Sequence, residues 1–171
     1  MLQTPPNSRT MSRIALYAGS FDPITRGHED LIRRSLGFVD RLIVALAINV
    51  AKQPLFTIDE RKHFIRAAVG DEPRIEIREF EGLLVDFARS VGATVAIRGL
   101  RAVSDFEYEY QMALMNRHLH PTLETLFMVP SIDLTFVSSS LVREVARFGG
   151  ATSDLVHPTV EAALRARFAR K

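Results

Sequence analysis

The sequence contains no cysteine. This absence excludes disulfides, thiolate catalysis and cysteine-ligated zinc, and it fits a reducing cytosol. No apolar run approaches the ~20 residues that span a bilayer, and the first ten residues lack the apolar core of a secretory signal. The formal net charge is only +2, which is too small to indicate nucleic-acid binding. We therefore expect a cytoplasmic protein that binds neither membrane nor nucleic acid.

Length and composition predict one globular domain. The chain has 171 residues, of which 47% are hydrophobic and 25% charged, as in ordinary globular proteins. Residues 1–12 are rich in proline and polar side chains, so we expect a flexible leader, with Met11 as an alternative start. Residues 13–171 show no linker and no repeat, and we expect them to form a single domain.

Apolar runs typical of strands alternate with amphipathic runs typical of helices. The run at 42–47 is apolar throughout, which suits a parallel sheet covered on both faces. The alternation predicts an α/β fold with a doubly wound parallel sheet of about five strands, Rossmann-like in type. We expect strands at 13–18, 42–47, 74–80, 93–97 and 122–129. We expect helices from His28 to about 38, and at 57–69, 83–91, 104–118, 138–148 and 158–169, with capping boxes at Thr57–Glu60 and Ser104–Glu107.

The first strand-to-helix turn, residues 19–28, carries the strongest functional signal. In a parallel sheet such a turn lies at the carboxyl ends of the strands, where ligands bind. It has neither the GxGxxG nor the GxxxxGK[ST] pattern. Instead it places a hydroxyl at Ser20 and an imidazole at His28, directly after Gly27. These groups can hold phosphate oxygens at a helix N-terminus, where free N–H groups already favour anions.

Three further loops carry unusual polar content, and strand-end loops converge in this architecture. They contain Lys52, the arginines Arg98 and Arg101, and the serines of 138–140. Beyond Asp22 these loops hold no paired carboxylate and no activated nucleophile. The inventory suits the binding of several phosphates and the stabilisation of charge that develops among them, as phosphoryl-type transfer requires. His118 and His120 are spaced like a metal pair, but no carboxylate ligand lies nearby, so we interpret them as surface residues at a helix end. We assign no metal-ligating residue in this sequence.

The motifs resemble those of a known family. Thr25-Arg26-Gly27-His28 matches the T/HxGH signature of the nucleotidyltransferase superfamily. Lys52, Ile97–Arg101, Asp105–Glu109, Met115–Arg117 and Val137–Arg143 look like the bacterial pantetheine-phosphate adenylyltransferase family. The resemblance covers about residues 13–168. It implies adenylyl transfer from ATP to 4′-phosphopantetheine, with Mg²⁺, giving 3′-dephospho-coenzyme A and pyrophosphate in the penultimate step of coenzyme A biosynthesis. The attacking phosphate is already ionised at neutral pH, so the reaction needs no general base.

The same resemblance implies roles for individual residues. His28 would stabilise charge at the α-phosphate, Ser20 would lie between the substrates, and Lys52 and Arg98 would hold the pantetheine phosphate. The backbone at Leu84 would touch the pantetheine arm. ATP would be contacted by Ser20, His28, Phe21, Gly99, Leu100, Arg101 and Glu109, and by Leu134, Thr135, Phe136, Val137, Ser138, Ser139 and Ser140.

The sequence departs from the family pattern at four positions. Ser20 replaces threonine but keeps the hydroxyl, and Arg26 replaces asparagine and adds a positive charge. Leu134 stands where an aromatic residue is common, so we expect no stacking on adenine there, and Val50 replaces a proline near Lys52.

The resemblance also implies a homohexamer and feedback by coenzyme A. Surplus apolar residues on the helix expected at 104–118 fit an oligomer contact. Two other functions stay open at this point. One is adenylyl transfer to another phosphate, such as nicotinate mononucleotide or glycerol phosphate, and the other is a non-catalytic adenine-nucleotide sensor on the same fold.

Overall fold

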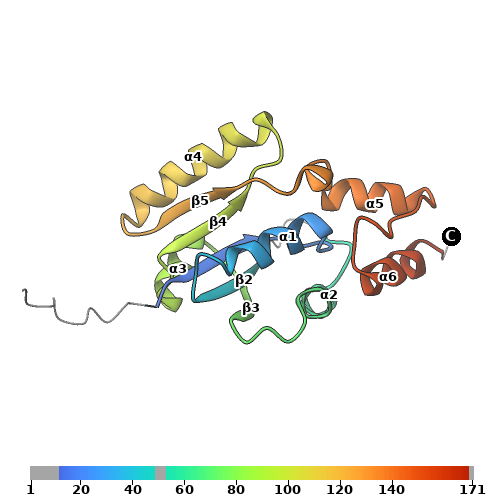
Figure 1. Cartoon of the computed structure of the whole chain (residues 1–171), viewed down its shortest axis with the longest axis horizontal. Helices are drawn as coiled ribbons and strands as arrows, with labels where there is room; N and C mark the ends of the chain where they lie inside the picture. The colour runs from blue at the N-terminus through green and yellow to red at the C-terminus, as the bar shows by residue number, and fades with distance from the viewer. Residues whose placement is uncertain (1–11, 49–52, 170–171) are drawn as a thin grey trace, which may run out of the picture.

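The computed structural model describes residues 12–48 and 53–169, and it confirms the predicted alternation of strands and helices (Figure 1). The predicted leader at 1–12 and the loop with Val50 and Lys52 fall almost wholly outside the described residues. The strands are β1 (Ile14–Gly19), β2 (Arg41–Ala47), β3 (Ile75–Phe80), β4 (Val95–Gly99) and β5 (Glu124–Met128). The helices are α1 (Arg26–Ser35), α2 (Ile58–Val69), α3 (Leu84–Val91), α4 (Val103–Leu119), α5 (Ser139–Arg147) and α6 (Pro158–Phe168), with a short 3₁₀ turn η1 (Ile132–Leu134).

The five strands form one parallel sheet in the order β3-β2-β1-β4-β5. β2 and β3 lie on one side of β1, and β4 and β5, which come later in the sequence, lie on its other side. The strand order therefore reverses between β1 and β4. In doubly wound folds a crevice opens outside the carboxyl ends of the strands at this switch point, so the topology predicts a binding site there.

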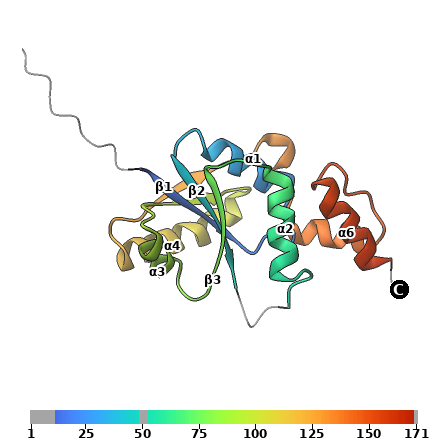
Figure 2. The same ribbon diagram turned by 90° about the horizontal axis from the view of Figure 1, so that it is seen from below.

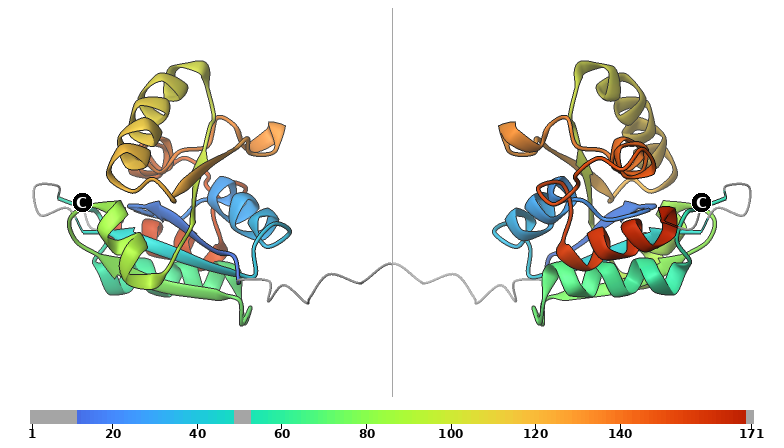
Figure 3. Two further views of the ribbon diagram at one scale, coloured as in Figure 1. Left: turned by 90° about the vertical axis from the view of Figure 1, so that its left-hand side faces the viewer. Right: turned by 90° about the vertical axis from the view of Figure 1, so that its right-hand side faces the viewer.

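Each face of the sheet is covered by helices, because alternate strand residues point to opposite sides. Tyr17 and Val44 belong to the larger core cluster, to which α1, α2, α5 and α6 also contribute. Leu16 and Ile43 belong to a second cluster with α3. Figure 2 shows α2 and α6 on the far side of the strands from α3 and α4, and Figure 3 shows the same layers from the two ends. This double coverage explains why β1, and β2 from Leu42 onward, consist of apolar and aromatic residues.

The local sequence correctly predicts where α2 begins, but the predicted start of α4 and the predicted end of β4 need correction. Thr57 and Glu60 form the predicted capping box of α2. The capping box predicted at Ser104 is wrong: α4 begins at Val103, because Ala102 already has the extended backbone of a cap residue and makes no side-chain cap bond. β4 also continues through Arg98 and Gly99, which pair with β5. Arg98 is therefore a strand residue, held more firmly than the loop position predicted for it.

In the part of the chain that the structure describes, no helix combines the length and the apolar character needed to cross a membrane.

Candidate active site

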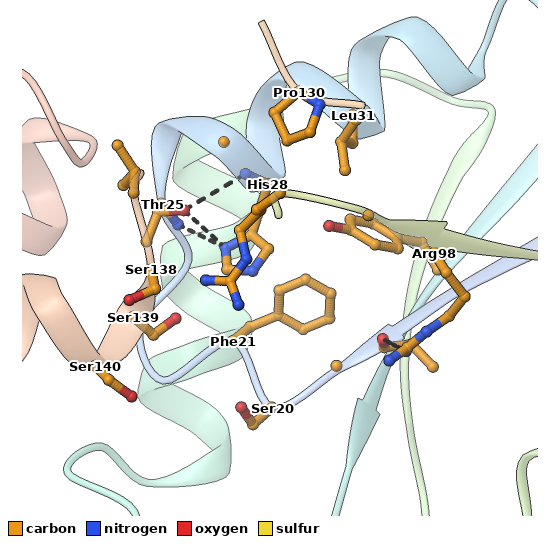
Figure 4. Close-up of a pocket in the computed structure, with 17 residues that line it drawn as sticks. Ser20, Phe21, Thr25, His28, Leu31, Arg98, Pro130, Ser138, Ser139 and Ser140 are labelled. Carbon is orange, nitrogen blue, oxygen red and sulfur yellow. Dashed lines mark hydrogen bonds between the residues drawn. The ribbon is translucent and has the colours of Figure 1, made fainter. Parts of the chain in front are cut away.

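A cleft of about 530 Å³ opens where β1 and β4 end, bounded by the first turns of α1 and α5. Figure 4 shows His28 and Phe21 in its centre, with Ser138, Ser139 and Ser140 on one side and Arg98 on the other. The cleft lies at the switch point of the sheet, as the topology predicts. Its lining combines hydroxyls, an imidazole and guanidinium groups with only a few apolar side chains.

The turn that leaves β1 takes an unusual backbone path. Phe21 has a φ of +45°, which is uncommon for any residue except glycine. Its ring is almost fully buried and meets the rings of Tyr17 and His28 edge-on, at centroid distances of 5.5 and 5.1 Å. A strained backbone of this kind persists only where its surroundings hold it in place. The packing of the Phe21 ring is one such restraint.

Side chains from distant helices supply hydrogen-bond donors to the carbonyls of this turn. Arg61 of α2 donates from Nη1 to the Ser20 carbonyl at 2.8 Å. The Ser139 hydroxyl, at the start of α5, donates to the Pro23 carbonyl at 2.7 Å. Backbone carbonyls that leave a strand need partners when they are shielded from water. The turn is therefore tied to both helices that flank it.

Asp22 ties the same turn to the segment before α2. Asp22 is buried, with 6% of the residue's surface exposed. Its carboxylate accepts hydrogen bonds from the backbone N–H groups of Leu55 and Phe56 at 2.9 and 3.0 Å. Arg143 of α5 donates to the Asp22 carbonyl, and its guanidinium lies 3.5 Å from the carboxylate. All three interactions keep the carboxylate occupied. Asp22 is thus a structural anchor of the cleft rather than a free base.

His28 closes the N-terminus of α1 in a reciprocal capping arrangement. Nδ1 accepts a hydrogen bond from the Thr25 backbone N–H at 3.0 Å and lies 3.0 Å from the Thr25 hydroxyl. A backbone N–H can only donate, so Nδ1 carries a lone pair and the ring proton resides on Nε2. Burial, and to a lesser degree the positive charge of Arg101, lower the pKa of His28 to about 4. At neutral pH the side chain is therefore an uncharged imidazole that offers Nε2–H as a donor.

Arg98 forms a bidentate ion pair with Glu109 of α4. Its Nε and Nη2 donate to the two carboxylate oxygens at 2.7 and 2.6 Å, and Nη1 donates to the Ala18 carbonyl at 2.8 Å. Burial works against the charge on Arg98, but the hydrogen bonds and the negative charge of Glu109 prevail and raise its pKa. The geometry leaves N–H groups on both terminal nitrogens for a ligand.

The start of α5 forms the opposite wall. The Ser138 side chain accepts from the Leu141 N–H at 3.1 Å and caps the helix. The preceding segment crosses the first turn of α1, where the carbonyl oxygens of Leu134 and Val137 lie 3.5 and 3.9 Å from the position a Cβ on Gly27 would take. Two helix N-termini therefore converge on one cleft, and each favours negative charge.

The structure brings most of the predicted residues together. The predicted residues that line the cleft are Ser20, Phe21, His28, Arg98, Gly99, Arg101, Val137, Ser138, Ser139 and Ser140. Those outside its lining are Leu84, Leu100, Glu109, Leu134, Thr135 and Phe136, and Lys52 lies outside the described residues. Glu109 acts on the cleft through Arg98, whereas Leu84 starts α3 and packs against the second core cluster.

Sequence reasoning missed several groups. Tyr17, Leu31 and Pro130 also line the cleft, but as apolar or strand residues they carry no signal of their own. Thr25 was named in the T/HxGH signature but given no role, although a threonine three residues before His28 at a helix start is typical of an N-cap. Arg26, expected to add charge beside phosphates, instead pairs with Glu29 at 2.7 Å and is not among the lining residues.

The chain matches the cytidylyltransferase-like family over residues 16–145. It is 54% identical over 160 residues to the phosphopantetheine adenylyltransferase of Anaeromyxobacter dehalogenans strain 2CP-C, an alignment that covers 94% of this chain and 98% of the relative. The phosphopantetheine adenylyltransferase of Bordetella avium is 53% identical over 153 residues, covering 90% of this chain and 92% of the relative. The chain belongs to the phosphopantetheine adenylyltransferase family.

A solved structure supports the fold independently. A putative nicotinate-nucleotide adenylyltransferase from Vibrio parahaemolyticus superimposes with a TM-score of 0.69 at 17% identity, covering 94% of this chain and 98% of the other. At this identity the likeness concerns the architecture alone.

The described residues around the cleft do not form a set of protein ligands for a metal ion. Among residues 12–48 and 53–169, no three histidines or acidic residues gather to hold an ion. The carboxylates of Asp22 and Glu109 are occupied by N–H donors and arginines. Mg²⁺ is often bound mainly by substrate phosphates and water with one or two protein carboxylates. The described residues therefore do not fit a magnesium site built by the protein itself.

The pKa of His28 predicts a dependence of stability on pH. The unfolded chain binds a proton at the ordinary histidine pKa of 6.5, whereas the folded protein does so only near pH 4. Between these values the unfolded state binds more protons, so stability rises with pH and is lost as the pH falls. We expect His28 to account for a loss of about 3 kcal/mol in the free energy of unfolding between neutral pH and pH 4.

Urea unfolding at a series of pH values measures this loss. His28→Asn is the matched control, because its side-chain oxygen occupies the place of Nδ1 and accepts the Thr25 cap bond but does not titrate. The variant should lose clearly less stability on acidification than the wild type. Equal losses in both proteins would mean that His28 titrates normally in the folded state.

Proposed function

We propose that this protein transfers the adenylyl group of ATP to 4′-phosphopantetheine, which yields 3′-dephospho-coenzyme A and pyrophosphate. Two relatives named phosphopantetheine adenylyltransferase are more than half identical to it and align over nearly their whole length. The observation that carries the proposal is the uncharged His28, which presents a hydrogen-bond donor in the same cleft as Ser20, flanked by two helix N-termini.

The proposed reaction does not need a general base. An oxygen of the acceptor phosphate attacks the α-phosphorus of ATP, a new P–O bond forms, and the bond to the bridging oxygen of the β-phosphate breaks to release pyrophosphate. A phosphate monoester has a second pKa of about 6, so at neutral pH the attacking oxygen has no proton to lose. His28, with a pKa near 4, is a poor base but remains a donor. Its Nε2–H stabilises the charge that builds up on the α-phosphate oxygens.

The other polar groups divide between the two anionic substrates. The serines and N–H groups at the start of α5 bind the β- and γ-phosphates of ATP, together with Arg101. Arg98, oriented by Glu109, binds the acceptor phosphate through its remaining N–H groups, and Lys52 is the proposed second cation there. The Ser20 hydroxyl lies between the substrates and donates to the phosphate that moves. Positioning of this kind supplies most of the acceleration in phosphoryl-type transfer.

The remaining parts of the proposal concern partners. Mg²⁺ would be held mainly by the phosphates of ATP rather than by the described residues, and it would neutralise part of the phosphate charge. Several large apolar side chains of α4 are exposed, including Tyr108 and Met115 at 64% and 53%. Exposed apolar surface of this kind marks a protein–protein contact, and we propose that it packs against further copies in a homohexamer. Feedback by coenzyme A and a cytoplasmic location complete the proposal.

Incubation of the protein with ATP and one acceptor at a time tests the activity. Pyrophosphate release is measured with 4′-phosphopantetheine, nicotinate mononucleotide and glycerol phosphate. We expect rapid release only with 4′-phosphopantetheine, accompanied by a product with the mass of 3′-dephospho-coenzyme A. Release with another acceptor alone would assign a different substrate. ATP binding without release with any of the three would favour a nucleotide sensor.

His28→Ala separates a transition-state contact from a binding contact. The variant should lower kcat by about 100- to 1,000-fold, as for the loss of one oxyanion donor. Its dissociation constant for ATP, measured by calorimetry, should change little, because the contact tightens only as charge develops. His28→Gln is the partial rescue, since its amide can place an N–H near the position of Nε2. Equal losses in kcat and in ATP affinity would make His28 merely a binding residue.

A further inference from the structure

Arg61 is a buried cation with an unusual set of partners. It lies in the first turns of α2 and is only 6% exposed. Its Nη1 donates to the Ser20 carbonyl at 2.8 Å and its Nε to the Thr57 carbonyl at 3.4 Å. Among the residues that the structure describes, no carboxylate forms an ion pair with Arg61. Burying a guanidinium without a counter-ion is costly, so a function for this arrangement must be sought in the carbonyls that it binds.

The Ser20 carbonyl lies between the end of β1 and the strained residue Phe21. The pairing of β1 with β2 ends at Gly19, so the next peptide group has left the ladder. The residue that follows, Phe21, has the strained φ of +45°. Without a donor on the Ser20 carbonyl, the peptide between Ser20 and Phe21 could rotate toward a more favourable backbone conformation. Relaxation of the backbone on either side of that peptide would then leave the Ser20 hydroxyl without a fixed position in the cleft.

We propose that Arg61 is a positioning residue for adenylyl transfer, and that it acts through Ser20. By holding the Ser20 carbonyl it fixes the peptide plane, and the fixed plane aims the exposed Ser20 hydroxyl at the phosphate being transferred. Arg61 itself touches neither substrate. This inference rests on the proposed function and adds to it a residue that the T/HxGH signature does not contain.

A double-mutant cycle in the full-length protein tests the proposal. Arg61→Met keeps the length and bulk of the side chain and removes every donor, and it is combined with Ser20→Ala. Arg66→Met is the matched control, because Arg66 is exposed on the same helix and the change is identical. Arg61→Lys retains a cation and a single donor nitrogen. It should keep part of the activity, and it takes the place of the methionine variant in the cycle if that variant does not fold.

We expect Arg61→Met to lower kcat by about 10- to 100-fold, the scale of a small misplacement of a reacting group. The KM for ATP should change little, and unfolding should stay cooperative. In the Ser20→Ala background the same substitution should add less than about 3-fold, because residues that act through one another are not additive. Arg66→Met should resemble the wild type.

Three outcomes would overturn the inference. Losses that multiply in the double variant would show that Arg61 does not act through Ser20. An Arg61→Met variant as active as Arg66→Met would show that the contact has no catalytic consequence. If the wild type forms no product from ATP and 4′-phosphopantetheine, the proposed function fails, and the inference fails with it because no transfer remains to be positioned. Only this last outcome touches the proposed function.

Discussion

The carbonyl oxygens of the turn between β1 and α1 need hydrogen-bond donors, and this requirement organises the site. The turn leaves the sheet with Phe21 in a strained conformation, and the carbonyls of Ser20, Asp22 and Pro23 accept hydrogen bonds from side chains outside the turn. The donors come from α2 through Arg61 and from α5 through Ser139 and Arg143. The residues that the proposed chemistry uses, Ser20 and His28, lie at the two ends of this turn. The precision of the site therefore depends on helices far along the sequence.

A second constraint is the distribution of charge. The carboxylates near the cleft are occupied, Asp22 by two backbone N–H groups and Glu109 by Arg98. The groups left to face the cleft are neutral donors, guanidinium groups and helix N-termini. Such a lining attracts phosphates and does not repel them by negative charge. Because His28 is neutral, its Nε2–H donates a directed hydrogen bond, and the ring carries no acidic imidazolium proton that the attacking phosphate could take.

Much of this arrangement could be predicted from the sequence, because it depends on local patterns. The apolar runs predicted the strands, the capping residues Thr57 and Glu60 predicted the start of α2, and the residues around His28 predicted where the cleft opens. The cap predicted at Ser104 was wrong, because a cap depends on the backbone path out of β4 and not on side-chain type alone. Arg98 was placed in a loop, because the pairing of β4 with β5 extends past the apolar run.

Other parts depend on contacts between distant residues, which a single sequence does not reveal. Arg61 looks like any charged residue of an amphipathic helix until α2 is packed beside β1. The pairing of Arg98 with Glu109, and the role of Asp22 as an anchor for Leu55 and Phe56, likewise appear only once the sheet is assembled. The neutral state of His28 follows from burial, which no motif records.

The protonation of His28 is the measurement that tests this account most directly. Nitrogen-15 NMR of the histidine side chains, with His28 assigned by comparison with His28→Asn, distinguishes the two neutral tautomers and the imidazolium. The account predicts a neutral ring with its proton on Nε2 and a hydrogen-bonded lone pair on Nδ1, unchanged down to about pH 5, below the usual histidine pKa. A proton on Nδ1, or an imidazolium at neutral pH, would contradict it.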